Sequence, residues 1–173
     1  MRGKDQILLE SIYESILSNE DIIQHPPLER FDKKRYPNTE LVPVSYLNQI
    51  KEYDREDMFS SWEFKNFDEM EKEIFENGMK HPLFVSYSVP DKKVLLTEGN
   101  HRLFLANKLN IKYLPVLVSR QMSSFSGQQK LKAKEVSGWS ADENVHIPSN
   151  MKPSEVGIPA IPLPQYEKQN TDY

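Results

Sequence analysis

The chain has 173 residues, enough for one domain with a sizeable core and further segments at its ends. It contains no cysteine, which excludes disulfides, thiolate metal sites and cysteine catalysis. The net charge of -4 gives the whole chain no long-range attraction for nucleic acid, although a local basic patch could still bind it. No apolar run approaches the roughly twenty residues of a membrane span, and the first residues lack the apolar core of a signal peptide. We therefore expect a cytoplasmic protein without a membrane contact.

Residues 1–40 predict a helical extension followed by a linker. Apolar residues recur at helical spacing within Asp5–Leu17, and they are Ile7, Leu8, Ile12, Ile16 and Leu17. Such a helix docks on the rest of the domain, or else mediates self-association or the binding of a protein partner. Pro26 and Pro27 end this helical region. The basic triplet Lys33–Arg35 is either a solvated loop or a contact with nucleic acid.

A domain is predicted from about residue 41. Leu41–Val44 forms a short extended segment, and Ser45 is the expected N-cap of a helix that continues to about Tyr53. Three carboxylates follow closely, at Asp54, Glu56 and Asp57. They are candidate ligands of a divalent cation, and the alternatives are a solvated face or the start of the next helix.

The following stretch predicts a helix and a β-hairpin. Asp68–Asn77 has helical periodicity, and Gly78 is the glycine expected after the last helical turn. Residues 83–88 show the apolar alternation of a strand, and residues 94–97 are a second apolar run. We expect these two strands to pair with each other.

The stretch Lys93–Ser119 organises the chain. It predicts a strand, a tight turn, a helix and a second strand within roughly thirty residues, the usual size of a βαβ crossover. In such units ligands bind beyond the carboxyl ends of the strands, where we expect this turn to lie. At the turn, Gly99 suits a positive φ or the close approach of a ligand, and Asn100 is a good helix N-cap.

The start of the helix after this turn is a candidate anion site. The first amides of a helix favour an anion, and His101 and Arg102 add donors at the same place. An imidazole at a helix N-terminus should carry less charge than a free one, so His101 is expected to act as a neutral donor. The alternative is a capped helix with two polar residues on its surface.

Residues 121–173 predict less regular structure. Gln128–Val136 fits a short helix, and Ser140–Tyr173 is predicted as an extended, proline-rich arm. Within the arm, Ile158–Pro164 is polyproline-like and is expected to lie along a groove or bind a partner. We therefore divide the chain into an extension (1–40), a domain (41–120) and an arm (121–173). The fold class is α/β or α+β: a small mixed sheet with helices on it, a helical N-terminal extension and an irregular C-terminal arm.

The order of these elements resembles the ParB/sulfiredoxin superfamily over roughly Leu41–Ser119. Glu69–Val85 resembles the first box of the family, in which a helix, a glycine, a polar residue and a proline lead into an apolar strand. Glu98–Arg102 resembles the second box, a glycine turn followed by polar or basic residues. The resemblance implies the small mixed sheet and flanking helices of that superfamily.

Members of this superfamily bind nucleotide phosphates at the turn of the second box. The resemblance therefore implies that this turn binds the phosphates of ATP or another nucleotide, through its backbone and its polar side chains. Polar residues of the helix before the first box also approach the phosphates in the family. The implied nucleotide-binding residues are Gly99, Asn100, His101, Arg102, Lys72 and Lys65.

Departures from the family pattern narrow the range of activities that the resemblance implies. Sulfiredoxins carry a cysteine where this chain has Asn100, so reduction of cysteine sulfinic acid by that route is excluded. Partition ParB proteins have Glu-Arg-Arg after the glycine and a later helix-turn-helix domain, whereas this chain has Asn-His-Arg and no such pattern. The turn is closer to free serine kinases and to the ParB-like NTPase or nuclease proteins of plasmids and phages.

Three functional hypotheses follow. The first is an enzyme, a Mg²⁺-dependent NTPase or small-molecule kinase, whose implied catalytic residues are Glu98, His101 and Arg102. Arg102 and the metal would offset charge on the transferred phosphoryl group, and Glu98 or the acidic cluster at 54–57 would orient metal or nucleophile. The second is a ParB-like nuclease or DNA-binding protein, which predicts that Lys33–Arg35 or Lys130–Lys134 lies beside the anion site. The third is a non-catalytic module whose terminal segments bind a protein partner.

Overall fold

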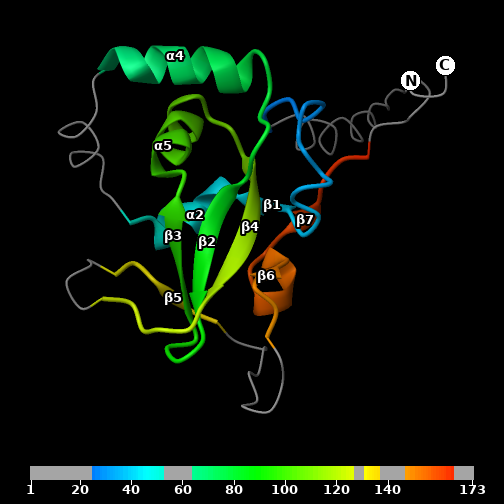
Figure 1. The fold of residues 1–173 in the computed structure, drawn as a ribbon. Helices are drawn as coiled ribbons and strands as arrows, with labels where there is room; N and C mark the ends of the chain where they lie inside the picture. The colour runs from blue at the N-terminus through cyan, green and yellow to red at the C-terminus, as the bar shows by residue number, and fades with distance from the viewer. Residues whose placement is uncertain (1–24, 53–63, 127–130, 137–146, 166–173) are drawn as a thin grey trace, which may run out of the picture.

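A curled mixed sheet is the centre of the fold in the computed structural model, which describes residues 25–52, 64–126, 131–136 and 147–165 (Figure 1). In chain order the elements are β1 (Glu40–Pro43), α2 (Val44–Ile50), α4 (Phe64–Phe75), β2 (Leu83–Ser88), β3 (Lys93–Glu98), α5 (Asn100–Lys108), β4 (Tyr113–Gln121), β5 (Lys134–Glu135), β6 (Asn150–Met151), the 3-10 helix η1 (Pro153–Val156) and β7 (Ile161–Pro162). In Figure 1, α5 lies between α4 and the strands. The predicted combination of a mixed sheet with helices is confirmed. The helix predicted within residues 5–17 lies outside the described residues.

The sheet joins strands that are distant in the sequence. The strands are hydrogen-bonded in the order β5-β3-β2-β4-β1-β7, and β6 pairs with β4. β2 and β3 form the predicted antiparallel hairpin, in which Phe84 lies opposite Glu98. The other edge of β2 pairs in parallel with β4, and Leu83 lies opposite Val116.

The observed strand pairing places the turn at Gly99 at a different edge of the sheet from the predicted one. Because β3 is antiparallel to β2 and β2 is parallel to β4, the strands on either side of α5 run in opposite directions. The predicted βαβ crossover between β3 and β4 is therefore wrong, since β3 first pairs locally with β2 and α5 then leads to the far edge of β2. The turn follows the carboxyl end of β3, but it lies at the amino ends of β2 and β4.

The helices begin earlier than predicted. α2 begins at Val44, with Pro43 in the N-cap position, so the prediction that Ser45 is the cap is wrong. α4 begins at Phe64, before the predicted start at residue 68. Gly78 has a φ of 104°, as expected for a glycine after a helix, and its N–H donates to the carbonyl of Ile74 over 3.1 Å. Within the described ranges, no helix is long and apolar enough to cross a membrane.

The C-terminal part of the chain packs on the same sheet. β6 adds to β4 and β7 adds to β1, so the part of the predicted arm that the structure describes lies against the domain. The helix predicted for residues 128–136 is wrong for the described residues 131–136, which contain β5 at the edge of β3. Directly after this short strand, Val136 is buried and its N–H donates to the carbonyl of Lys92 over 2.9 Å.

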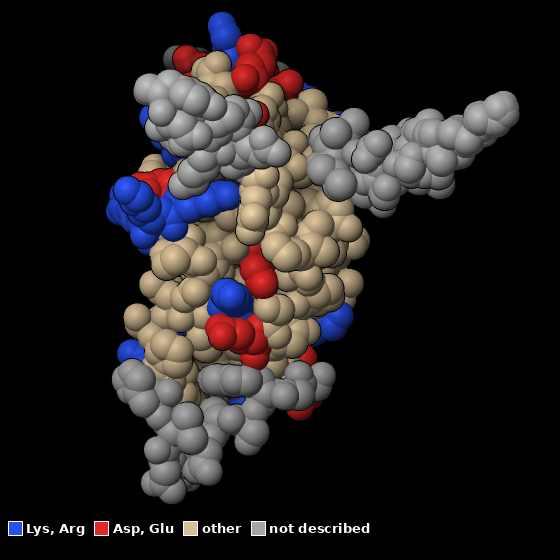
Figure 2. Space-filling view, turned by 90° about the vertical axis from the view of Figure 1, so that its right-hand side faces the viewer, with Lys and Arg blue, Asp and Glu red and all other residues tan. Residues whose placement is uncertain are grey.

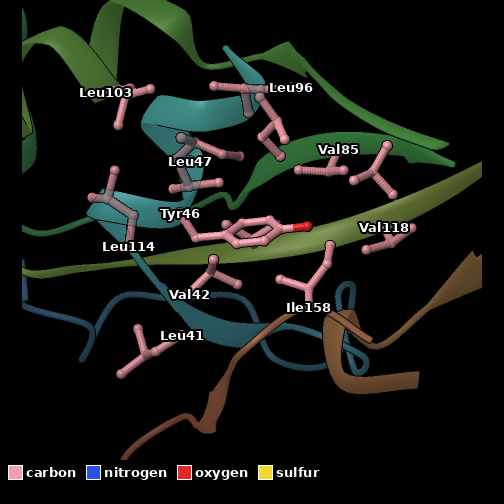
Figure 3. Packing of buried hydrophobic residues seen from close by; sticks show 14 of the residues in the cluster. Leu41, Val42, Tyr46, Leu47, Val85, Leu96, Leu103, Leu114, Val118 and Ile158 are labelled. Carbon is pink, nitrogen blue, oxygen red and sulfur yellow. The ribbon is translucent and has the colours of Figure 1, made fainter. Parts of the chain in front are cut away.

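The hydrophobic core packs α2 against the sheet and also includes Leu103 of α5 and Ile74 of α4 (Figure 3). Leu47 of α2 and Val85 of β2 are fully buried, and Figure 3 shows both near the ring of Tyr46. The segment before β1 contributes Leu28, and the C-terminal segment contributes Ile158. Segments on both sides of the predicted domain therefore belong to its core.

Candidate functional site

The turn after β3 is built around Gly99. This residue has a φ of 112° and takes the N-cap position of α5, and its carbonyl accepts the N–H of Leu103 over 2.9 Å. The predicted positive φ is confirmed, but the prediction that Asn100 is the cap is wrong, because Asn100 is the first residue of the helix. A Cβ atom at position 99 would lie 2.4 Å from Cγ of Leu83. The glycine is therefore required by the close packing of β2 against the turn.

Asn100 points inward and joins two segments. Its side chain is buried, its Oδ1 accepts the N–H of Glu52 over 3.1 Å, and its Nδ2 donates to the carbonyl of Leu96 over 3.5 Å. Lys51 also forms an isolated parallel bridge with Leu96. Asn100 thus fixes the chain after α2 to the end of β3, and its side chain supports the turn from inside.

Arg102 is held in place by the loop before β2. Its half-buried guanidinium donates to the carbonyl of His81 over 2.9 Å and to the carbonyl of Pro82 over 3.1 Å. Burial lowers the pKa of this guanidinium, whereas Glu98 and Tyr36 act in the opposite direction. The two bonds use two of the five N–H groups of a guanidinium, and the cation remains charged at any ordinary pH.

A pocket of about 670 Å³ lies beside this turn. Its lining combines two guanidinium groups, one carboxylate, one imidazole and two aromatic rings, and the residues are Arg35, Tyr36, His81, Pro82, Phe84, Glu98 and Arg102. His81 and Pro82 come from the first box, and Glu98 and Arg102 come from the second. The two boxes therefore meet at one shallow, open pocket, where Arg102 bonds them directly.

Aromatic side chains form one wall of the pocket. The ring of Tyr36 lies edge to face with His81, at 5.6 Å between ring centroids and 85° between planes. It meets Phe84 at 6.0 Å and 70°. The guanidinium carbon of Arg35 lies 5.2 Å from the centroid of the same ring. Sequence reasoning missed Tyr36 and Phe84, and it named Arg35 only as part of a basic triplet.

Gly99, Asn100 and His101, three further predicted site residues, are not in the lining of this pocket. Gly99 and Asn100 support the turn from behind, and His101 is half-buried. Burial lowers the pKa of the His101 imidazole, and the carboxylate of Glu98 partly opposes this shift. Burial favours the neutral form of the ring, whereas the prediction named the helix N-terminus as the cause; the role of His101 as a donor to an anion stays a prediction.

The two predicted lysines lie on α4. Lys72 is exposed in its last turn, and Lys65 is in its first turn. Glu71, the neighbour of Lys72, pairs with Lys108 over 3.6 Å, at the far end of α5 from the turn. The candidate metal ligands Asp54, Glu56 and Asp57 lie outside the described residues. Within the described residues, no group of three His, Asp or Glu side chains could hold a metal ion.

Of the basic residues expected beside a DNA site, the pocket contains Arg35. Lys33 instead donates to the carbonyl of Pro164 over 2.9 Å. Lys134 donates to Gln49 over 2.8 Å and lies near the start of β3, opposite Val94, whereas the pocket is at the other end of that strand. On the face shown in Figure 2, Lys and Arg atoms lie next to Asp and Glu atoms at the top, the centre and the left. Among the described residues, this face carries both signs of charge and shows no broad basic surface.

A second hollow, of about 360 Å³, lies between α2, the end of α5 and the start of β4. Asn48 and Asn107 face each other there and exchange side-chain hydrogen bonds of 2.9 and 2.8 Å. Its two central amides bond to each other, and the lining also carries Ser45, Asn110, Lys112 and Tyr113. Among the described residues, this lining differs from that of the Arg102 pocket in having neither a guanidinium nor a carboxylate.

Comparison of the chain with protein-family models, curated proteins and solved structures finds no match in any of the three. The resemblance to the ParB/sulfiredoxin superfamily therefore stays a prediction.

Proposed function

We propose that this protein binds a nucleotide in the pocket of Arg102 and acts on its phosphates, as a Mg²⁺-dependent NTPase or small-molecule kinase of ParB/sulfiredoxin type. The observation that carries the proposal is the meeting of both family-like boxes at one pocket with cationic and aromatic sides. A nucleotide combines an anionic phosphate chain with a flat base, and this lining offers a partner for each.

The cationic side of the pocket has a fixed part. The carbonyls of His81 and Pro82 hold Arg102 in one orientation. Its remaining N–H groups are therefore oriented before a ligand arrives, which lowers the entropic cost of binding a phosphate. Arg102 would also offset charge that develops on a transferred phosphoryl group.

Glu98 supplies the acidic group of the proposed chemistry. It is exposed at the end of β3 and lines the same pocket as Arg102. Mg²⁺ in nucleotide sites is commonly held by one or two carboxylates together with phosphate oxygens and water, so a single carboxylate fits this metal. When bound, Mg²⁺ would shield the charge of the phosphates. Glu98 would hold the metal or orient the attacking nucleophile.

The test is a thermal-unfolding screen with ATP, ADP and GTP, each with and without Mg²⁺. A ligand at a hundred times its Kd stabilises the native state by about 2.7 kcal/mol. For a chain of this size that corresponds to an increase in Tm of roughly 5–10 °C. Phosphate release, or transfer to a small hydroxyl compound, then identifies the reaction.

Glu98→Gln separates the two parts of the proposal. This variant should keep the Tm increase caused by nucleotide alone and lose the additional increase caused by Mg²⁺. Lys34→Ala, which removes an exposed cation outside the pocket lining, is the matched control and should behave like the wild type. If no nucleotide raises the Tm at millimolar concentration, the proposal is wrong and a partner-binding module becomes the leading alternative. Stabilisation by DNA alone would favour the nuclease or DNA-binding alternative.

A further inference from the structure

The two arginines of the pocket are held differently. Arg102 donates to two backbone carbonyls and is half-buried. Arg35 is exposed, and its guanidinium lies over the ring of Tyr36. A cation over an aromatic ring at an exposed position is a weak contact. Another flat group can therefore displace the Arg35 guanidinium from the ring of Tyr36 at a low cost in free energy.

The ring of Tyr36 is positioned by its neighbours. The rings of His81 and Phe84 meet it at steep angles. Phe31, which also precedes β1, has its ring centroid 6.1 Å from that of Tyr36. These contacts fix the plane of the ring while the Arg35 side chain occupies a face of it. A fixed, half-buried ring beside a cationic pocket is suited to stacking against a base, because little side-chain freedom is lost on binding.

We infer that Tyr36 is the platform on which the nucleobase stacks, and that Arg35 leaves this ring to contact the phosphates when the base binds. The inference rests on the proposed function and specifies its ligand: a base-bearing free nucleotide is bound in preference to a polyphosphate of similar charge. Stacking is available to every base, so discrimination among bases is small. Recognition then depends on Arg35 and Tyr36, which precede β1 and lie outside both boxes.

The experiment is calorimetric titration of the whole chain with ATP and with tripolyphosphate, at one fixed Mg²⁺ concentration. In the wild type, ATP should bind at least about fivefold more tightly than tripolyphosphate, because only ATP carries a base. Tyr36→Leu should bring this ratio to about one, whereas Tyr36→Phe, which retains the ring, should preserve it.

Arg35 is tested in the same titrations. Arg35→Ala removes an exposed side chain, so the variant should fold even if Tyr36→Leu does not. It should weaken ATP by about tenfold and tripolyphosphate by less, because only a ligand with a base displaces Arg35 from the ring of Tyr36 toward the phosphates. Lys34→Ala is the matched control and should leave both affinities unchanged.

Equal wild-type affinities for ATP and tripolyphosphate would overturn the inference and leave the proposed phosphate site standing. The same conclusion follows if Arg35→Ala changes neither affinity. If neither ligand binds the wild type, the proposed function fails and the inference fails with it. If a single-stranded oligonucleotide binds more tightly than ATP and Tyr36→Leu abolishes that binding, the inference of a free nucleotide is wrong. The ligand of this pocket is then a nucleic acid.

Discussion

The substitution Gly99→Ala adds one methyl group where the backbone and a neighbouring side chain both oppose it. The φ of 112° is a conformation that side chains rarely adopt, with a cost of about 1–3 kcal/mol. The added Cβ would also lie 2.4 Å from Cγ of Leu83, and relieving such overpacking costs about 1–3 kcal/mol. We therefore expect a loss of roughly 2–6 kcal/mol in the free energy of unfolding, measured by urea denaturation.

Gly78→Ala is the matched control for the backbone contribution. Its φ of 104° is similar, but a Cβ added at position 78 would lie no closer than 3.1 Å to a neighbouring atom, the carbonyl oxygen of Pro27. This variant should lose about 1–3 kcal/mol, mostly from backbone strain, because its added Cβ makes a tight contact but does not overlap a neighbour as the Cβ at position 99 does. A double-mutant cycle with Leu83→Ala isolates the steric part, because Gly99→Ala should cost less when the leucine has been removed. If Gly99→Ala costs no more than Gly78→Ala, and shows no coupling to Leu83, the packing argument is wrong.

Three further predictions concern the side chains that follow this glycine. Asn100→Ala should lower the free energy of unfolding by about 1–3 kcal/mol, because the N–H of Glu52 and the carbonyl of Leu96 lose their partner; unchanged stability in urea would contradict this. Arg102→Lys should lower the free energy of unfolding of the ligand-free protein by about 1–2 kcal/mol, because an ammonium cannot replace the planar guanidinium that reaches two carbonyls. Wild-type stability of this variant in calorimetry would contradict this. Burial lowers the pKa of His101 below its ordinary value of 6.5, so the unfolded chain takes up the proton more readily. Stability should therefore fall as the pH drops from 6.5 through the lowered folded pKa, and His101→Gln should flatten this dependence in unfolding curves recorded between pH 7 and 5.

Local sequence patterns were sufficient for the elements around the site. Alternating apolar residues identified β2, whose Leu83, Val85 and Tyr87 are fully buried. A glycine between a strand and a helix identified the turn with a positive φ at Gly99. The cap was misassigned to Asn100 because its side chain, a good N-cap in isolation, is instead used in a buried contact with the segment after α2.

Patterns within short windows were insufficient for strand pairing and for the far wall of the pocket. The direction of β4 relative to β3 depends on which edge of β2 each strand joins, and no local periodicity encodes that choice. Arg35 and Tyr36 reach the pocket through tertiary packing over more than forty positions of sequence, so their own neighbourhood shows only a basic triplet and a tyrosine. The buried Ile158 belongs to the segment that was predicted to be an extended arm lying along a groove or binding a partner, and its proline-rich pattern does not mark it as part of the core.

The most direct measurement for the central claim is an amide NMR titration of the ¹⁵N-labelled protein with Mg²⁺ and ATP. We expect the largest shift changes at the pocket, at the amides of Arg35, Tyr36, Phe84, Glu98 and Arg102. The amides around the second hollow, at Asn48 and Asn107, should remain near their free positions. Changes centred on that second hollow, or no changes at millimolar nucleotide, would contradict the assignment of the pocket as a nucleotide site.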